Sequence, residues 1–265
     1  MYRKCNISSG LLFSALSIAI FSGAAHAENR VVEDTLIYND PTVAIEGKWG
    51  SGIAVDYYNL KNDTPALGGP ATYKFNQYGM SGWIGLDNVS VLVSYKNGDG
   101  SSDVTFPDLG PAHGANHRKE FEIDARWLMR NFSTSFLTPY VLVGYVDGRM
   151  TTVYSFEKVA GTIDYERKYT APLVGIGAII PVNEKIGFRV DGKYLWSKND
   201  TSTSSAGLDT LYSSYSVKRM RASLTGYYNI AAGFNVQAGY RFEKNVSDGD
   251  STDKAVYAML GYSFK

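Results

Sequence analysis

The sequence predicts an all-β fold: a transmembrane antiparallel up-and-down β-barrel of about ten strands, with eight or twelve strands as alternatives. Three observations predict it. Apolar and charged residues alternate with a period of two, the connections between the alternating segments are short and long in turn, and an export leader opens the chain. The composition also favours strands, with 27 Gly, 20 Tyr and 12 Phe among 265 residues.

Residues 1–27 have the pattern of a cleavable export signal, which leaves residues 28–265 as a single barrel domain. Arg3 and Lys4 form a basic start, an uncharged apolar run follows over 11–25, and Ala-His-Ala ends the segment at position 27. The apolar run is shorter than the ~20 residues that span a bilayer. The chain's one cysteine, Cys5, lies in this leader, so disulfides are excluded from the predicted mature protein.

The clearest alternation lies between His117 and Arg130. Phe121 and Ile123 fall on one side of an extended chain, whereas Glu120 and Glu122 fall on the other. A helix would mix these two sets, but a strand separates them. Ten segments of this kind run over 43–59, 72–86, 89–96, 117–130, 138–154, 165–180, 186–198, 213–229, 234–244 and 255–264.

The connections between these segments sort by parity. The short ones follow the even-numbered segments, at 87–88, 131–137, 181–185 and 231–233. The longest ones, 97–116 and 199–212, follow odd-numbered segments. Long loops at one end and tight turns at the other are typical of barrels that span an outer membrane. An even number of strands puts both termini at the end with the short turns.

The charged faces are predicted to line the lumen, because Arg or Lys on the lipid face at the membrane midplane costs ~2–4 kcal/mol. Apolar and aromatic faces then meet lipid. The predicted lumen-lining residues are Glu46, Lys48, Asp56, Lys74, Glu120, Glu122, Asp124, Arg126, Asp147, Arg149, Arg189, Asp191, Lys193, Arg219, Arg221, Arg241 and Glu243.

This mixture of charges has two interpretations. In one, the groups pair across the lumen and close a narrow barrel, because buried charges need partners. In the other, they face a narrow water-filled pore for small ions and polar solutes. Ten strands lie just above the eight whose interior side chains can fill, and well below the 16–18 of open porins.

The last predicted strand carries a further signal. Val256, Ala258, Leu260, Tyr262 and Phe264 alternate and end on an aromatic residue. This pattern resembles the terminal strand by which Gram-negative outer-membrane β-barrel proteins are recognised during assembly. The resemblance implies a location in the outer membrane with both termini periplasmic. It also implies the barrel-assembly machinery, outer-membrane lipid and lipopolysaccharide as partners.

Binding at the cell surface is an alternative function, because the predicted outward loops are acidic. They hold Asp63, Asp99, Asp103, Asp108, Glu157, Asp164, Asp200, Asp209, Asp248, Asp250 and Asp253. Nucleic acid is not an expected partner, since 26 basic residues balance 26 acidic ones. The sequence leaves the oligomeric state open.

A second alternative is an outer-membrane lipid hydrolase. It would need a His–Ser type of site, and His117 with Ser94 or Ser223 is the available combination. Ten strands is also the size of the omptin surface proteases, but the chain has no Asp-x-His motif of the omptin kind. The leading expectation is therefore a protein without enzymatic activity, a metal or a cofactor.

Overall fold

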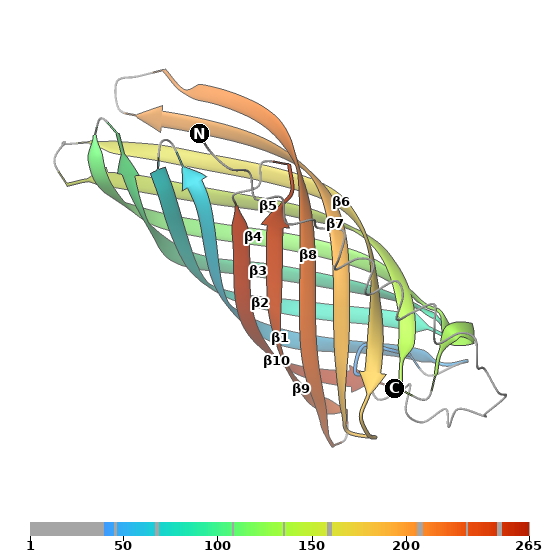
Figure 1. Ribbon diagram of the computed structural model, residues 1–265. Helices are drawn as coiled ribbons and strands as arrows, with labels where there is room; N and C mark the ends of the chain where they lie inside the picture. Colours follow the sequence, from blue (N-terminus) through green and yellow to red (C-terminus); the bar gives the residue numbers. More distant parts are fainter. Residues whose placement is uncertain are drawn as a thin grey trace, which may run out of the picture. The chain divides into compact units, whose positions relative to one another are not determined.

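A computed structural model describes residues 40–44, 47–66, 69–107, 109–134, 136–157, 161–205, 209–231, 233–247 and 251–264, with the side chains of 65, 66, 69 and 70 left aside. The predicted leader lies outside these residues. Ten antiparallel strands close into a barrel in which β1 pairs with β10 (Figure 1). They are β1 (Trp49–Ala66), β2 (Gly69–Leu86), β3 (Val89–Phe106), β4 (Gly110–Leu128), β5 (Thr138–Phe156), β6 (Thr162–Pro181), β7 (Ile186–Ser205), β8 (Leu211–Ala231), β9 (Phe234–Asn245) and β10 (Thr252–Phe264).

The predicted fold class and strand number are confirmed. Each of the ten predicted segments overlaps one strand, although β1 begins at Trp49 instead of residue 43 and β3 extends well past residue 96, and each strand pairs with its neighbours in sequence. A short 3-10 helix, η3 (Arg130–Phe132), lies between β4 and β5. Among the described residues, no helix combines the length and apolar character needed to cross a membrane.

The prediction of long loops is wrong for the two longest ones, 97–116 and 199–212. Most of 97–116 belongs to a hairpin in which β3 and β4 pair as far as Phe106 and Gly110. Most of 199–212 likewise belongs to β7 and β8, which pair as far as Thr203 and Leu211. The outward residues of these strand extensions are polar instead of apolar. The sequence therefore loses its hydrophobic alternation there, although the backbone pairing continues.

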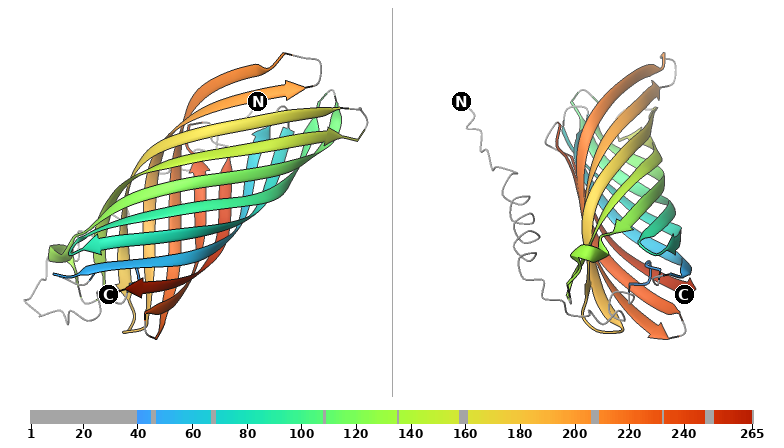
Figure 2. Two further views of the ribbon diagram at one scale, coloured as in Figure 1. Left: turned by 180° about the vertical axis from the view of Figure 1, so that it is seen from behind. Right: turned by 90° about the vertical axis from the view of Figure 1, so that its right-hand side faces the viewer.

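The outward face carries a continuous apolar band. All ten strands expose large apolar side chains on it, and Ile53, Met80, Val143, Leu224 and Leu260 are among them. An exposed apolar surface of this extent is unfavourable in water and marks contact with a membrane. The band lies toward the end of the barrel where the connections are short, and Figure 2 shows the closed wall of tilted strands that carries it.

Most strands are longer than a membrane requires. Strands β1 to β8 have 18 to 21 residues, whereas ~9–11 tilted residues span a bilayer. Strands β9 and β10 have only 12 and 13 residues. The sheet therefore continues beyond the apolar band over most of the circumference. It extends least far at the β9–β10 hairpin, whose two strands are the shortest (Figure 1).

A pair of matched substitutions tests the position of the band. Val143 and Val153 both lie exposed on the outward side of β5, and only Val143 is inside the band. Val143→Arg should lower the free energy of unfolding by about 2–4 kcal/mol, whereas Val153→Arg should change it by about 1 kcal/mol or less. Urea unfolding in lipid vesicles measures both values, and equal losses would contradict the assigned band.

Candidate functional site: a charged lumen

The centre of the lumen is organised around the carboxylates of β4. Because side chains of a strand alternate, Glu120, Glu122 and Asp124 all point inward, and all three are buried. Cations from distant strands reach them. Lys193 on β7 binds Glu122 at 2.6 Å and also binds Asp124. These contacts hold three charges together inside the barrel.

Arg221 on β8 joins two carboxylates. Its Nη1 donates to Glu122 Oε2 at 2.7 Å and its Nε donates to Glu243 Oε2 at 2.6 Å. Glu243 also accepts a hydrogen bond from Arg219 Nη1 at 2.6 Å. Charge-assisted hydrogen bonds of this length are the strong ones, so Arg221 links β4 to β8 and β9 firmly.

Glu120 is the most heavily surrounded carboxylate. Arg118 Nη2 and the Tyr169 hydroxyl donate to its Oε2 at 2.8 and 2.7 Å. Arg241 and Lys96 approach its Oε1 at 3.5 and 3.6 Å. A tyrosine can reach this position from β6 because Gly148 on the adjacent β5 has no Cβ, which would overlap the tyrosine ring.

These ion pairs cross the lumen from one wall to the other. In the ring of ten strands, β9 lies five strands from β4 in either direction, and β8 lies four strands away. The Arg241–Glu120 and Arg221–Glu122 contacts therefore bridge opposite walls. Breaking one partner of a buried pair leaves an uncompensated charge and costs about 3–5 kcal/mol.

The short segment before β1 occupies the end of the lumen where the connections are short. Residues 40–44 are all buried. Asp40 pairs with Arg189 at 3.1 Å, and Thr42 Oγ1 accepts hydrogen bonds from Arg126 and Arg189 at 2.9 and 3.1 Å. The buried side chain of Val43 belongs to an apolar cluster on the inner wall. The sequence analysis wrongly assigned residues 43 and 44 to the first strand, which begins at Trp49, and it missed residues 40–42 because they carry no alternating pattern.

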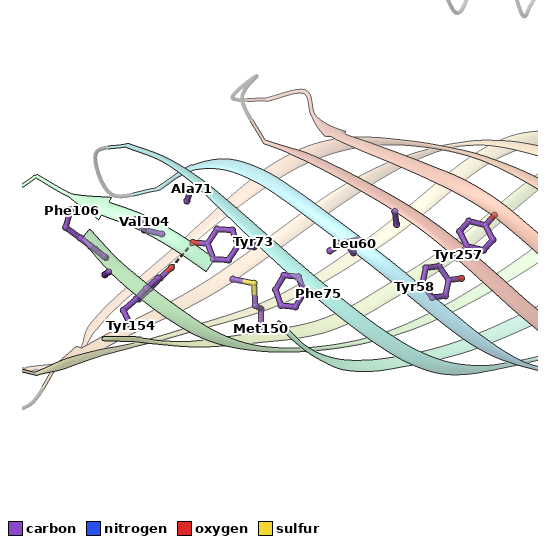
Figure 3. Packing of buried hydrophobic residues seen from close by; sticks show 12 residues of the cluster. Tyr58, Leu60, Ala71, Tyr73, Phe75, Val104, Phe106, Met150, Tyr154 and Tyr257 are labelled. Atoms are coloured by element: carbon purple, nitrogen blue, oxygen red, sulfur yellow. Dashed lines mark hydrogen bonds between the residues drawn. The ribbon is translucent and has the colours of Figure 1, made fainter. Parts of the chain in front are cut away.

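The opposite end of the lumen holds a cluster of aromatic and apolar side chains beside the buried Arg118–Asp253 pair. Figure 3 shows inward aromatic side chains gathered there, with the Tyr73 and Tyr154 hydroxyls 2.7 Å apart. Phe75 and Met150 pack into the same buried cluster. The sequence analysis predicted charges along the whole lumen and missed this cluster. Its signal was available, since aromatic residues alternate with polar ones in the first part of β2.

Between the ion pairs and the short segment lies a polar cavity of about 150 Å³. Asp56, Lys96, Arg126 and Asp191 are among the residues that line it. A cavity of this size and polarity has room for several water molecules. Asp56 accepts a hydrogen bond from Ser81 at 3.1 Å through one of its carboxylate oxygens.

The structure places most of the predicted lumen residues inside the barrel, buried or nearly so. They are Asp56, Glu120, Glu122, Asp124, Arg126, Arg189, Asp191, Lys193, Arg219, Arg221, Arg241 and Glu243. Inward Lys96 and Arg118 were missing from the prediction, although each takes part in the network. Glu46 lies outside the described residues.

Four predicted lumen residues are placed differently. Asp147, Arg149 and Lys74 are exposed on the outward face, and Lys48 is exposed just before β1. The prediction was wrong for these residues because β2 and β5 continue beyond the apolar band. Charges on their outward face there meet water rather than lipid and carry no penalty. Arg149 pairs on this outer surface with Glu166 at 3.0 Å.

The histidines of the suggested hydrolase site lie on the outer surface beyond the apolar band. His117 binds Asp99 at 2.8 Å, and His113 binds Asp103 at 2.7 Å. Hydrogen bonds to Asp103 and Glu157 raise the pKa of His113. Ser94 and Ser223 lie on the inward-facing positions of their strands, so the wall of the barrel separates both from His117.

The predicted assembly residues all lie on the outward side of β10. Val256, Leu260 and Phe264 are more than half exposed there, and Ala258 and Tyr262 share this side. Their role in assembly stays a prediction. Among the described residues, no cluster of His, Cys, Asp and Glu has the arrangement of a metal site.

A closed antiparallel barrel with an apolar outer band and a charged interior is the fold of outer-membrane β-barrel proteins. The outer membrane protease OmpT from Escherichia coli is similar, with a TM-score of 0.54 and 13% identity over 82% of this chain and 96% of the protease. The translocator domain of the autotransporter NalP from Neisseria meningitidis is also similar, with a TM-score of 0.52 and 10% identity over 96% of both chains. No protein-family model matches the sequence, and a search of curated proteins found no significant match.

The cross-lumen pairs make a testable contribution to stability. Arg221→Met leaves Glu122 and Glu243 with only Lys193 and Arg219 as partners, so the free energy of unfolding should fall by about 3 kcal/mol. Arg149→Met removes an exposed pair on the outer surface and should cost about 1 kcal/mol or less. Urea unfolding in vesicles measures both losses. A negligible loss for Arg221→Met would refute a network that holds the walls together.

Proposed function

We propose that the protein is a non-enzymatic outer-membrane barrel whose lumen is closed to solutes, with both termini on the periplasmic side. The observation that carries the proposal is the set of ion pairs that bridge opposite walls through Glu120 and Glu122. The apolar band and the short turns at the end with both termini support the placement in the membrane.

Three layers support closure rather than a narrow pore. Residues 40–44 fill the periplasmic end, the ion pairs cross the middle, and an apolar cluster lies inside the opposite end. An ion entering such a lumen would have to displace charged partners that are held by short hydrogen bonds, or pass a packed aromatic cluster in which the Tyr73 and Tyr154 hydroxyls are hydrogen-bonded to each other. Both steps carry a large desolvation cost.

Single-channel conductance of the refolded protein in a planar bilayer tests the proposal. The wild type should give no discrete steps at any ionic strength. Replacing Glu122, Lys193 and Arg221 together with Ser removes the central bridges, and steps should appear when residues 40–44 are also replaced by Gly and Tyr73, Phe75 and Tyr154 by Ala, because all three layers are then removed. The matched control replaces the outward Asp147, Arg149 and Glu166 with Ser and should stay silent. Steady steps from the wild type would overturn closure and favour the narrow channel.

A second candidate function, binding at the cell surface, is favoured by the extension of the sheet beyond the apolar band. The β7–β8 hairpin continues past the point where β9 stops pairing, at Arg219 and Asn245. Leu211 and Tyr212 at its tip are 72% and 81% exposed. A rigid sheet that presents apolar side chains to solvent is suited to contact with another surface.

Trimming this hairpin in register tests the second candidate. Replacing residues 201–213 with Asn-Gly leaves the Asp200–Ser214 pair to close a two-residue turn, which the remaining strands favour. Adherence of cells that carry the wild-type barrel to mammalian cells and immobilised glycans should fall at least tenfold on trimming. A heat-modifiable band in electrophoresis should show that the barrel still folds. Unchanged adherence would show that the hairpin does not mediate binding.

A further inference from the structure

Three lysines stand side by side on the outer surface. Lys61 on β1 lies directly opposite Lys74 on β2 and directly opposite Lys254 on β10. All three are exposed and face outward. Like charges directly opposite one another destabilise a sheet, so this row has a cost that folding alone does not explain.

Few negative charges compensate the row. Lys61 pairs with Asp63 at 3.1 Å, but no described carboxylate lies within 4 Å of the ammonium group of Lys74 or Lys254. A second row of cations, Lys119, Arg149 and Lys168, lies across β4, β5 and β6. There Glu166 pairs with both of its neighbours in the row, at 3.0 Å with Arg149 and 3.2 Å with Lys168. Among the described residues, the row on β2, β1 and β10 thus leaves two ammonium groups outside any ion pair, those of Lys74 and Lys254, whereas the second row leaves one, that of Lys119.

An apolar groove of about 880 Å³ lies on the same strands inside the apolar band. Its floor consists of small residues in register, Gly226 on β8, Ala238 on β9 and Ala258 on β10. Larger rings stand at either end of this row, Phe188 on one side and Tyr57 on the other. The groove opens to the outside of the barrel, so in a membrane only lipid can enter it.

The lysine row and the groove are spaced as the two ends of one lipid would be. Lys61 is four residues beyond Tyr57 along β1, and Lys254 is four residues beyond Ala258 along β10. Four residues of a strand span about 13 Å. Tyr57 and Tyr78 stand in register with the groove floor at its β1–β2 end, with ring centroids 5.3 Å apart, so aromatic rings of the kind that meet lipid headgroups border the groove on the strands that carry Lys61 and Lys74.

We propose that this face binds one lipid of the outer leaflet whose headgroup carries phosphate and a net negative charge. The phosphate lies on the Lys74–Lys61–Lys254 row, and an acyl chain lies in the groove over Gly226, Ala238 and Ala258. Three ammonium groups supply the positive charge that a phosphate needs, and the anion in turn relieves their mutual repulsion. This inference rests on the proposed placement in the outer membrane.

Native mass spectrometry of the detergent-purified barrel tests the proposal. The protein is mixed with equal amounts of diphosphorylated lipid A and phosphatidylethanolamine. The wild type should retain lipid A at least tenfold more than phosphatidylethanolamine. The double substitution Lys61→Gln/Lys254→Gln should remove that preference. Ala238→Phe, which fills the groove with an apolar ring on the lipid face, should weaken retention of both lipids.

A matched control and a competitor complete the test. Lys198→Gln/Lys218→Gln removes two exposed lysines elsewhere on the outer surface and should leave retention unchanged. An equal loss of lipid A retention in this control would overturn the proposed site, because it would show that lipid A responds only to the overall positive charge of the surface. Displacement of lipid A by inorganic phosphate, with no effect of Ala238→Phe, would also overturn it in favour of a free anion site. Failure of the wild type to insert into vesicles would instead contradict the membrane placement itself.

Discussion

The structure depends on one constraint: charges that cannot face lipid must find partners inside a narrow barrel. Each membrane-spanning strand has one face toward hydrocarbon, and a charge on that face costs ~2–4 kcal/mol. The carboxylates of β4 therefore point inward, where Glu120 and Glu122 are buried. Buried charges are stable only when paired. The pairing with β8 and β9 follows from this requirement, and it ties opposite walls together.

The same requirement organises the two ends of the lumen differently. At the end where the connections are short, the inward Arg189 binds Asp40 of the segment before β1, so a piece of chain that belongs to no strand becomes part of the interior. At the opposite end, beyond the apolar band, charges can face outward into water. Arg149 and Glu166 do so there, while aromatic side chains such as Tyr73 and Tyr154 occupy many of the inward positions beside the buried Arg118–Asp253 pair. Beyond the boundary of the membrane, both sides of the wall therefore carry charge.

The sequence predicted the fold and much of the central lumen because both depend on the period-two pattern alone. Inward Glu122 and outward Phe121 could be assigned from alternation, without knowledge of any partner. The position of Asp147 could not be assigned in this way, because residues alternate with the same period inside the membrane and beyond it. The pattern gives the face on which a residue lies, but the solvent that this face meets depends on how far the strand has risen through the bilayer.

The sequence by itself determined ten antiparallel strands, their order and the end at which the short turns lie, since local alternation and turn length specify these features. Only the tertiary structure decided which charges meet. Arg241 and Glu120 are 121 residues apart and become neighbours because the ring closes with their strands on opposite sides. The row of Lys74, Lys61 and Lys254 likewise exists only because β1 pairs with both β2 and β10. Barrel closure is a long-range property, and no local pattern records which side chains it brings together.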